Sequence, residues 1–542
     1  MSGHTFHENT LEPKTMRKPF VFLKSRAVLA VLSVALAGTG VEGAEGTVPE
    51  GWREVFVYCQ EVVAGFGEDG EAVVVRREAE PPAPPDPSAP PFDPDGEAAE
   101  QASGGDAGRK EAFMAWLEGE CAEAGETVLV AGTDEGGVYV LSEHGAAARG
   151  LKRYDMAEGR AVWVTDPGEA RELVGPVFAP GAGGGGRLAG LVWNSPEGAR
   201  TEWLDPAMGV VQERLGEAFP GAGFDWVATS PDGGRWIVRV RHRGRPAEWL
   251  CVDAAGASWR VLAECPVEVS PTVRGLFRWT ASDGMRLTGV YTRPEGGGPY
   301  PLVVFPHGGP GALSTVDFDE RVWALADAGF AVFQPNYRGS AGLGKAFRFA
   351  GWGAEGIRRA LMDVREGVAA LRAEAGARLD DSSPVLLGGS WGGYVAVAEL
   401  ALHPGEWAGA VSFFGAFDLP ELLRAEWARA GEGETATAAE RARRSLRRQF
   451  GDPGAGSDME ALGAISPVRM AVAIREPVVL FHNKGDRVIA FGQSEGMAKA
   501  LREAGGRVCF RSGSGAHGWG AEEEAGVYTE LVGVLRRWGR GG

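Results

Sequence analysis

The sequence predicts two modules, an all-β N-terminal module and a C-terminal α/β module with a mostly parallel, doubly wound sheet. The chain has 542 residues, which is too long for one ordinary hydrophobic core. From about 125 to 272, short apolar runs are broken by turn residues at regular intervals. From about 275 onward, apolar strand candidates alternate with helical stretches. The change of pattern places the boundary near 272.

The first segment, 1–43, resembles an extension followed by a secretion signal. Basic residues between Met16 and Arg26 precede an apolar run at 27–37 that is short for a membrane span. Small or short residues follow this run, so we expect cleavage near Ala44 and a true start at Met16. The mature protein would then be secreted or periplasmic, with no stable membrane span. An uncleaved membrane anchor is the alternative.

The N-terminal module is expected to be β-rich. Residues 44–80 would begin it, 81–110 would form a flexible linker because proline, alanine and glycine dominate, and 111–272 would form the module proper. The turns at 230–236 and 154–159 are similar to the repeats of bacterial β-propellers. A propeller blade takes about 40 to 50 residues, so this stretch holds only about four or five blades. We therefore predict a shortened, incomplete propeller-like domain.

The C-terminal module spans 273–542. Strands are expected at 302–305, 331–333, 385–387, 410–414, 478–481 and 508–510, and helices at 322–328, 361–373, 394–402 and 493–503. Two earlier strands, 277–280 and 287–291, flank the turn at 282–284 and predict an antiparallel hairpin that leads into the sheet.

The most informative motif is Gly-x-Ser-x-Gly at 388–392, which lies between an expected strand and an expected helix. That context is typical of a nucleophile elbow, a sharp turn that exposes the serine of an α/β-hydrolase. Ser390 is therefore the candidate nucleophile. Trp391 would offer its backbone N–H to an oxyanion at the helix start. The alternative is a plain tight turn.

A serine nucleophile needs a base, and the base needs an orienting acid. In this fold the chain order is serine, acid, histidine. His517 lies in a loop after the last expected strand, and we predict that it is the base. His403 is expected to cap the helix after Ser390, and His482 to pack or bond locally.

Asp486, just beyond the strand at 478–481, is the preferred acid, and Asp418 is its rival. Either residue could instead be a turn aspartate that bonds its own backbone. The second oxyanion donor should follow an early strand, which favours the N–H of Gly309. A purely structural turn is the alternative there.

Composition excludes some partners. The formal charge of −18 argues against nucleic acid, and the basic run at 441–448 is expected to be a solvated helix face. Five cysteines cannot all pair within one chain, although Cys251 and Cys265 could bridge neighbouring strands if the protein is exported. Their spacing matches no metal site, and no metal or organic cofactor is expected.

These motifs together resemble the prolyl oligopeptidase family of serine peptidases, in particular its acylaminoacyl-peptidase and dipeptidyl-peptidase branches. The resemblance covers about 270–535 and rests on ordered motifs at 307–310, 336–340, 389–394, 418–419, 466–467, 485–488 and 517–518. It implies a triad of Ser390, Asp486 and His517, an oxyanion hole from Gly309 and Trp391, and a propeller that restricts substrate access.

The chain departs from that family in two places. Asn483 follows His482 where the family usually has glycine, and asparagine tolerates the same left-handed geometry. The N-terminal module is short, and no acidic residue that would hold a substrate amine can be assigned in it. We expect a serine peptidase that acts on short peptides through an acyl-enzyme. A carboxylesterase with the same machinery and a catalytically inactive binding module are the alternatives. Residue preference, exo- or endopeptidase action and oligomeric state stay open.

Overall fold

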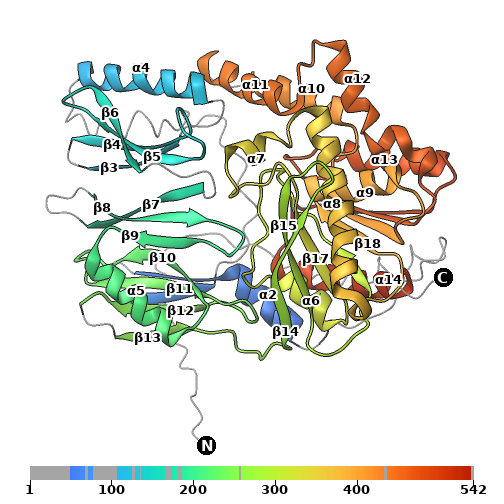
Figure 1. The fold of residues 1–542 in the computed structure, drawn as a ribbon, viewed down its shortest axis with the longest axis horizontal. Coiled ribbons are helices and arrows are strands. Elements are labelled where there is room, and N and C mark those ends of the chain that lie inside the picture. Colours follow the sequence, from blue (N-terminus) through green and yellow to red (C-terminus); the bar gives the residue numbers. More distant parts are fainter. Residues whose placement is uncertain are drawn as a thin grey trace, which may run out of the picture. The chain divides into compact units, whose positions relative to one another are not determined.

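The structure is a computed structural model that describes residues 49, 51–66, 71–76, 107–124, 129–134, 136–165, 172–180, 186–255, 258–431 and 436–538 (Figure 1). All of them lie in one compact unit, Gly46–Gly542. The expected signal segment 1–43 lies outside the described residues, as does most of the expected linker 81–110.

The C-terminal part forms one eight-stranded sheet in the order β14-β15-β17-β16-β18-β19-β20-β21. The hairpin β14–β15 and the pair β15–β17 are antiparallel, and all the other pairs are parallel. The strands are β14 (Thr272–Thr280), β15 (Arg286–Pro294), β16 (Leu302–Val304), β17 (Ala331–Asn336), β18 (Val385–Gly389), β19 (Gly409–Phe413), β20 (Val478–Asn483) and β21 (Val508–Gly513). The expected hairpin and doubly wound sheet are confirmed.

Helices surround this sheet (Figure 1). They are α6 (Glu320–Asp327), α7 (Lys345–Phe349), α8 (Gly353–Ala375), α9 (Trp391–Leu402), α10 (Leu419–Arg429), α11 (Ala436–Phe450), α12 (Gly456–Ala464), α13 (Gly492–Glu503) and α14 (Ala521–Trp538). Helix α9 packs on β18 and β19 and is buried on every side, which explains why its sequence is apolar all round. The sheet and α9 thus form a rigid base for residue 390.

Three antiparallel sheets of three or four strands precede this module in the described part of the chain, besides a two-stranded hairpin (Figure 1). The first contains β3 (Leu129–Asp134), β4 (Gly137–Ser142), β5 (Gly150–Asp155) and β6 (Arg160–Thr165). The second contains β7 (Glu172–Pro180), β8 (Gly186–Asn194) and β9 (Arg200–Trp203). The third contains β10 (Gly223–Thr229), β11 (Arg235–Arg241), β12 (Glu248–Asp253) and β13 (Trp259–Ala263). Each is a meander of consecutive strands, as expected for propeller-like blades.

The sheets stack face to face. Leu141 and Leu151 of the first sheet pack with Leu173 and Trp193 of the second. The second and third sheets share another cluster, to which helix α5 (Pro206–Ala218) also contributes. Helix α4 (Ala107–Ala124) covers the remaining face of the first sheet, where Phe113 is fully buried.

A helix and a hairpin cover the other end of the stack. Helix α2 (Trp52–Glu61) and the hairpin of β1 (Val62–Phe66) and β2 (Ala72–Arg76) pack on the third sheet, where Tyr58 and Ala64 meet Ile237 and Trp249. Both outer faces of the three-sheet stack are therefore covered.

Helix α2 lies where the sequence predicted the start of a β-rich region. Trp52, Val55 and Phe56 are fully buried, and their spacing places them on one helical face. The indole Nε1 of Trp52 donates a hydrogen bond to Asp327 Oδ2 at 2.7 Å, and α2 packs on α6 and α14. The segment therefore joins the α/β module through its helix and the third sheet through its hairpin.

Cys251 and Cys265 are free thiols in the structure. Cys251 pairs with Arg260 within the sheet, whereas Cys265 lies beyond the end of β13, past Ala263, which pairs with Trp249. The two cysteines lie at different levels of the strand pair, so the bridge considered from the sequence does not form.

Candidate active site

Ser390 lies at a sharp turn between β18 and α9. Its backbone has φ 55° and ψ −122°, a conformation that non-glycine residues adopt at a cost of about 1–3 kcal/mol. A Cβ on Gly388 would lie 2.2 Å from the carbonyl oxygen of Gly392, and one on Gly392 would lie 2.2 Å from that of Pro306. The close approach of backbones explains both glycines, and the strained turn has the geometry of a nucleophile elbow.

The predicted oxyanion donors lie on two facing segments. Trp391 is the first residue of α9, so helix geometry leaves its N–H without a partner in the helix. Facing it, a Cβ on Gly308 would lie 3.4 Å from Ser390 Cβ and 3.9 Å from the Trp391 nitrogen. The next residue, Gly309, has φ +119°. Gly308 and Gly309 thus let their loop lie against the turn of Ser390. Gly308, which the sequence did not single out, is the residue of the two that faces Ser390 directly.

His307 fixes this glycine loop from behind. Its ring stacks on Tyr337 at 4.5 Å between centroids, and the Tyr337 hydroxyl donates to the His307 carbonyl at 2.6 Å. Burial lowers the pKa of His307 to about 4, so the ring is neutral at physiological pH. Its Nδ1 lies 2.9 Å from the Gly308 carbonyl oxygen, and its Nε2 lies 2.8 Å from the Ser340 hydroxyl oxygen.

His517 and Asp486 form the tightest pair in the site. Nδ1 of His517 lies 2.6 Å from Oδ2 of Asp486, whose side chain is fully buried. The other carboxylate oxygen, Oδ1, accepts the backbone N–H groups of Val488 at 2.8 Å and Ile489 at 3.0 Å. Burial acts to raise the pKa of Asp486, but hydrogen bonds from His482, His517 and the Ile489 amide hold it well below its usual range. The aspartate is therefore a fixed anion against the imidazole.

The rival residues have local roles. Asp418 is the N-cap of α10, where its side chain accepts the Glu421 N–H at 3.1 Å. His403 is the C-cap of α9, as expected. His482 accepts from Ser494 Oγ at 2.7 Å and donates from Nε2 to the Ile489 carbonyl at 3.0 Å. Its Nε2 also lies 3.2 Å from Asp486 Oδ2, four residues along the chain, so His482 bonds locally as expected.

Ser390 and His517 line one cavity of about 540 Å³. Phe413 and Phe414 form an apolar wall with Trp519, and Phe414 is itself held at φ 55°. The remaining wall is polar and charged and contains Arg274, Asp317, Asp319, Glu320, Arg321 and Glu524. The cavity can therefore accept a chain with both apolar and charged groups beside the serine.

The N-terminal module supports one wall of this cavity. The carbonyl of Pro196 accepts the N–H of Val316 at 3.0 Å, and that of His242 accepts the N–H of Phe318 at 2.8 Å. Arg241 pairs with Asp317 across the same contact. Because residues 313–321 line the cavity, the module shapes the site directly.

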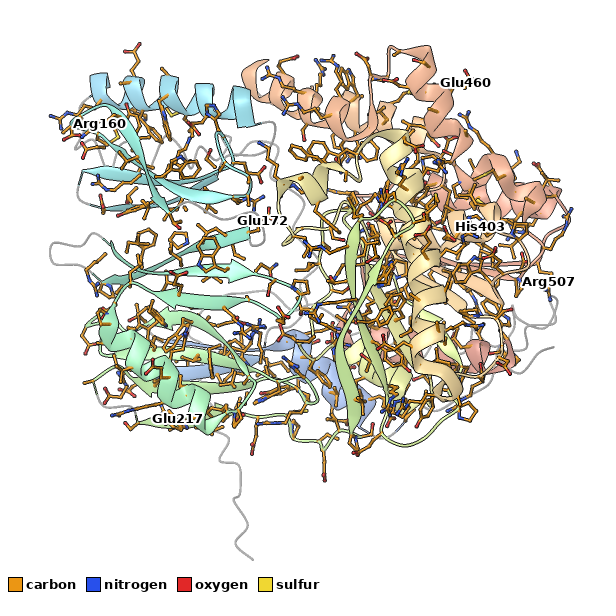
Figure 2. All side chains as sticks on the ribbon, viewed as in Figure 1. Arg160, Glu172, Glu217, His403, Glu460 and Arg507 are labelled. Atoms are coloured by element: carbon orange, nitrogen blue, oxygen red, sulfur yellow. The ribbon has the colours of Figure 1, made fainter. Side chains whose placement is uncertain are left out.

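A buried ion-pair cluster holds the two modules together beside α7. Arg348, from α7, bridges Glu143 and Glu172, and all three side chains are buried. Glu172, labelled in Figure 2, is the first residue of β7 and also accepts the Gly342 N–H. This cluster fixes the segment next to Ser340, the residue that bonds His307.

Within the described ranges, no group of three or more histidine, cysteine, aspartate or glutamate side chains is arranged to hold a metal ion. None of the helices described there is long and apolar enough to cross a membrane.

Comparison with known proteins identifies the C-terminal region. The sequence model of the prolyl oligopeptidase family matches residues 316–531. Dipeptidyl aminopeptidase BIII of Pseudoxanthomonas mexicana is 27% identical over 392 residues, which cover 67% of this chain and 52% of that protein. The human acylamino-acid-releasing enzyme is 27% identical over 211 residues, or 37% of this chain and 26% of that one.

Solved structures show the same fold. The acylaminoacyl peptidase of Pyrococcus horikoshii superposes with a TM-score of 0.59 at 16% identity, covering 76% of this chain and 63% of that one. A puromycin-hydrolyzing peptidase of Mycobacterium tuberculosis superposes with a TM-score of 0.57 at 23% identity, covering 75% and 60%. These likenesses confirm the expected fold class, an α/β-hydrolase module preceded by a shortened propeller-like module.

This chain spans only part of these relatives, about half the length of the Pseudoxanthomonas protein. The matched region nevertheless contains Ser390, Asp486 and His517 in the expected order. Residues 316–531 therefore match the prolyl oligopeptidase family, as the motifs in the sequence indicated.

Proposed function

We propose that this protein is a serine peptidase that hydrolyses peptide bonds of short peptides. Ser390 is the nucleophile, His517 the base, and Asp486 the acid that orients His517. The backbone N–H groups of Trp391 and Gly309 are the proposed oxyanion donors. The family match supports peptidase chemistry, and the relatives named above are a dipeptidyl aminopeptidase and an acylamino-acid-releasing enzyme.

The proposed hydrolysis has two steps, acylation of Ser390 and then hydrolysis of the acyl-enzyme by water. Ser390 Oγ attacks the carbonyl carbon, and its proton passes to Nε2 of His517, since Nδ1 faces Asp486. The tetrahedral oxyanion is held by the backbone donors, and the imidazolium then protonates the leaving amine, which leaves an acyl-enzyme. A water molecule, deprotonated by the same nitrogen, releases the acid and restores Ser390.

One observation carries the proposal. His517 is held by its Nδ1 against a buried carboxylate, and its ring borders the same cavity as the strained Ser390. That arrangement fixes one ring nitrogen and leaves the other for proton transfer beside the serine. A serine that only formed a turn would not require the pair of His517 and Asp486 at the same cavity.

Labelling with a fluorophosphonate probe tests the proposal. The wild type should be labelled at Ser390, and Ser390→Ala should lose both labelling and peptidase activity. Ser457→Ala, which changes an exposed serine on α12, is the matched control and should keep both. Labelling that persists in Ser390→Ala would refute the nucleophile assignment.

The carboxylesterase alternative is tested on matched substrates. We expect measurable kcat/KM on peptide amides as well as on p-nitrophenyl esters of the same acyl group. Ester turnover without detectable amide cleavage would assign the protein to the esterases while leaving the triad in place.

A further inference from the structure

The side chain of Asn483 links the strand that precedes the acid to the loop that carries the base. Asn483 is the last residue of β20 and is only 2% exposed. Its Nδ2 donates to the carbonyl of Ala516 at 3.0 Å and to that of Gly518 at 2.9 Å. These are the residues on either side of His517, so one carboxamide holds the backbone of the base from both sides.

The loop is shaped to receive this carboxamide. A Cβ on Gly513 would lie 2.1 Å from Asn483 Oδ1, and one on Gly515 would lie 2.9 Å from Nδ2. Only glycine leaves room at these two positions for the side chain of Asn483. Two backbone hydrogen bonds, from Lys484 to Gly513 and from Gly485 to Gly515, tie the same segments together.

The loop needs such a tether because its own sequence restrains it weakly. Glycine stands at 513, 515, 518 and 520, and Gly518 has φ +151°. Glycine loses more conformational freedom on ordering than any other residue, so each fixed position in this loop costs entropy. Hydrogen bonds to a buried carboxamide offset that cost and limit the positions that the imidazole can take.

The neighbouring residues place the acid on the same rigid segment. The Asp486 N–H donates to the Asn483 carbonyl at 3.2 Å, so both residues belong to one turn after β20. The side chain of Asn483 therefore holds the loop of His517 relative to the carboxylate of Asp486.

We propose that Asn483 is a positioning residue that sets the distance between His517 and Asp486. The proposal rests on the proposed function, in which His517 is the base. Asn483 touches none of the reacting atoms and does not itself line the cavity. It acts through the backbone on both sides of the imidazole.

Two variants test this role. Asn483→Gly removes the side chain and with it both hydrogen bonds, and Asn483→Asp keeps the shape but has no N–H to donate. A misplacement of the order of 1 Å at a catalytic group can cost about 100-fold in rate, so we expect kcat to fall about 10- to 100-fold in both variants. The KM should change less than about threefold, because Asn483 itself does not line the cavity.

The split between kcat and KM separates positioning from general destabilisation. A folded variant that misplaces the imidazole should lose kcat while KM stays nearly unchanged. Tyr58→Phe, which removes a hydrogen bond to Ala247 in the N-terminal module, is the stability control. It should lower Tm without lowering the kcat of the folded protein.

A spectroscopic readout is independent of turnover. The short hydrogen bond between His517 and Asp486 should give a downfield proton resonance, which is expected to weaken or vanish in both Asn483 variants. Unchanged kcat together with an unchanged resonance in either folded variant would overturn the proposal. Loss of the resonance in the variants, together with a wild type that the probe does not label at Ser390, would support the positioning role while refuting the proposed function.

Discussion

Nδ1 of His517 lies 2.6 Å from Oδ2 of Asp486, on a carboxylate that already has partners on both oxygens. Two backbone amides bind Oδ1, and the imidazole of His482 approaches Oδ2 at 3.2 Å. An anion with this many donors cannot rotate away from the histidine. The acid is thus fixed by its own turn, and the histidine loop is brought to it.

The first prediction distinguishes the two aspartates. Asp486→Asn should lower kcat about 10⁴-fold, because the imidazole loses the partner that fixes its tautomer and stabilises its charge. Asp418→Asn should leave kcat within about twofold, since asparagine caps a helix about as well as aspartate. Steady-state kinetics on a peptide amide measures both. The reverse ranking would assign the acid to Asp418.

The second prediction concerns Glu399, in the middle of α9. Its side chain is fully buried, and neither carboxylate oxygen has a hydrogen-bond partner among the described residues. Burial raises its pKa well above the ordinary value. Because the pKa of Glu399 is higher in the folded than in the unfolded state, the free energy of unfolding is greatest at pH values below the unfolded-state pKa of about 4.3. It decreases as the pH rises from there toward the folded-state pKa.

Glu399→Gln should therefore stabilise the protein increasingly with pH, by about 1–3 kcal/mol at pH 8 relative to pH 5. Urea unfolding at several pH values measures the difference. Glu460→Gln is the control, because Glu460 is exposed on α12 (Figure 2), and it should show no such trend. A constant difference across the pH range would mean that the Glu399 carboxyl is not protonated in the folded state.

The third prediction concerns the ion-pair cluster between the modules. Arg348→Met leaves the buried carboxylates of Glu143 and Glu172 without their main partner, so we expect a loss of about 3–5 kcal/mol. Arg358→Met breaks an exposed pair with Glu355 and should cost less than about 1 kcal/mol. Thermal unfolding compares the two. Equal, small losses would show that the cluster is not needed to join the modules.

Sequence reasoning succeeded where spacing alone dictates geometry. The glycines around Ser390 are required by backbone approach, and the order of serine, acid and histidine follows from the topology of the sheet. It failed at α2, because a ten-residue helix after a glycine has only a weak local signal and forms by packing on α6 and α14. Tertiary contacts decide such elements.

The second gap concerns a side chain that acts at a distance along the chain. Asn483 was expected to be neutral, yet its side chain binds the loop of His517. His482 bonds locally, as expected, and its contact with Asp486 spans only four residues. The Asn483 contact leaves no periodic pattern in the sequence, because it depends on how the ends of β20 and β21 meet at one edge of the sheet.

The fourth prediction concerns export. The basic start and short apolar run lead us to expect a mature chain that begins near Ala44 and is found outside the cytoplasm. Mass spectrometry of the native N-terminus measures this directly. A mature protein that keeps residues 18–26 would show an uncleaved anchor instead.

The last prediction concerns substrate size. The cavity beside Ser390 has a volume of about 540 Å³, which holds a few residues of an extended chain and not a folded domain. One of its walls, 313–321, is held by hydrogen bonds from the N-terminal module, so that module restricts the site by shaping its wall. This restriction does not require a closed ring of blades, which the three covered sheets do not form.

We therefore expect short peptides to be cleaved and folded proteins to resist. The measurement compares kcat/KM on a short peptide with the rate on the same sequence placed in a surface loop of a folded carrier. Arg241→Ala, which removes the pair with Asp317 behind the wall, should raise KM for the short peptide more than it lowers kcat, because it alters binding and leaves the reacting groups in place. Efficient cleavage of the folded carrier by the wild type would contradict the size restriction, and an unchanged KM in Arg241→Ala would show that the module does not shape the wall.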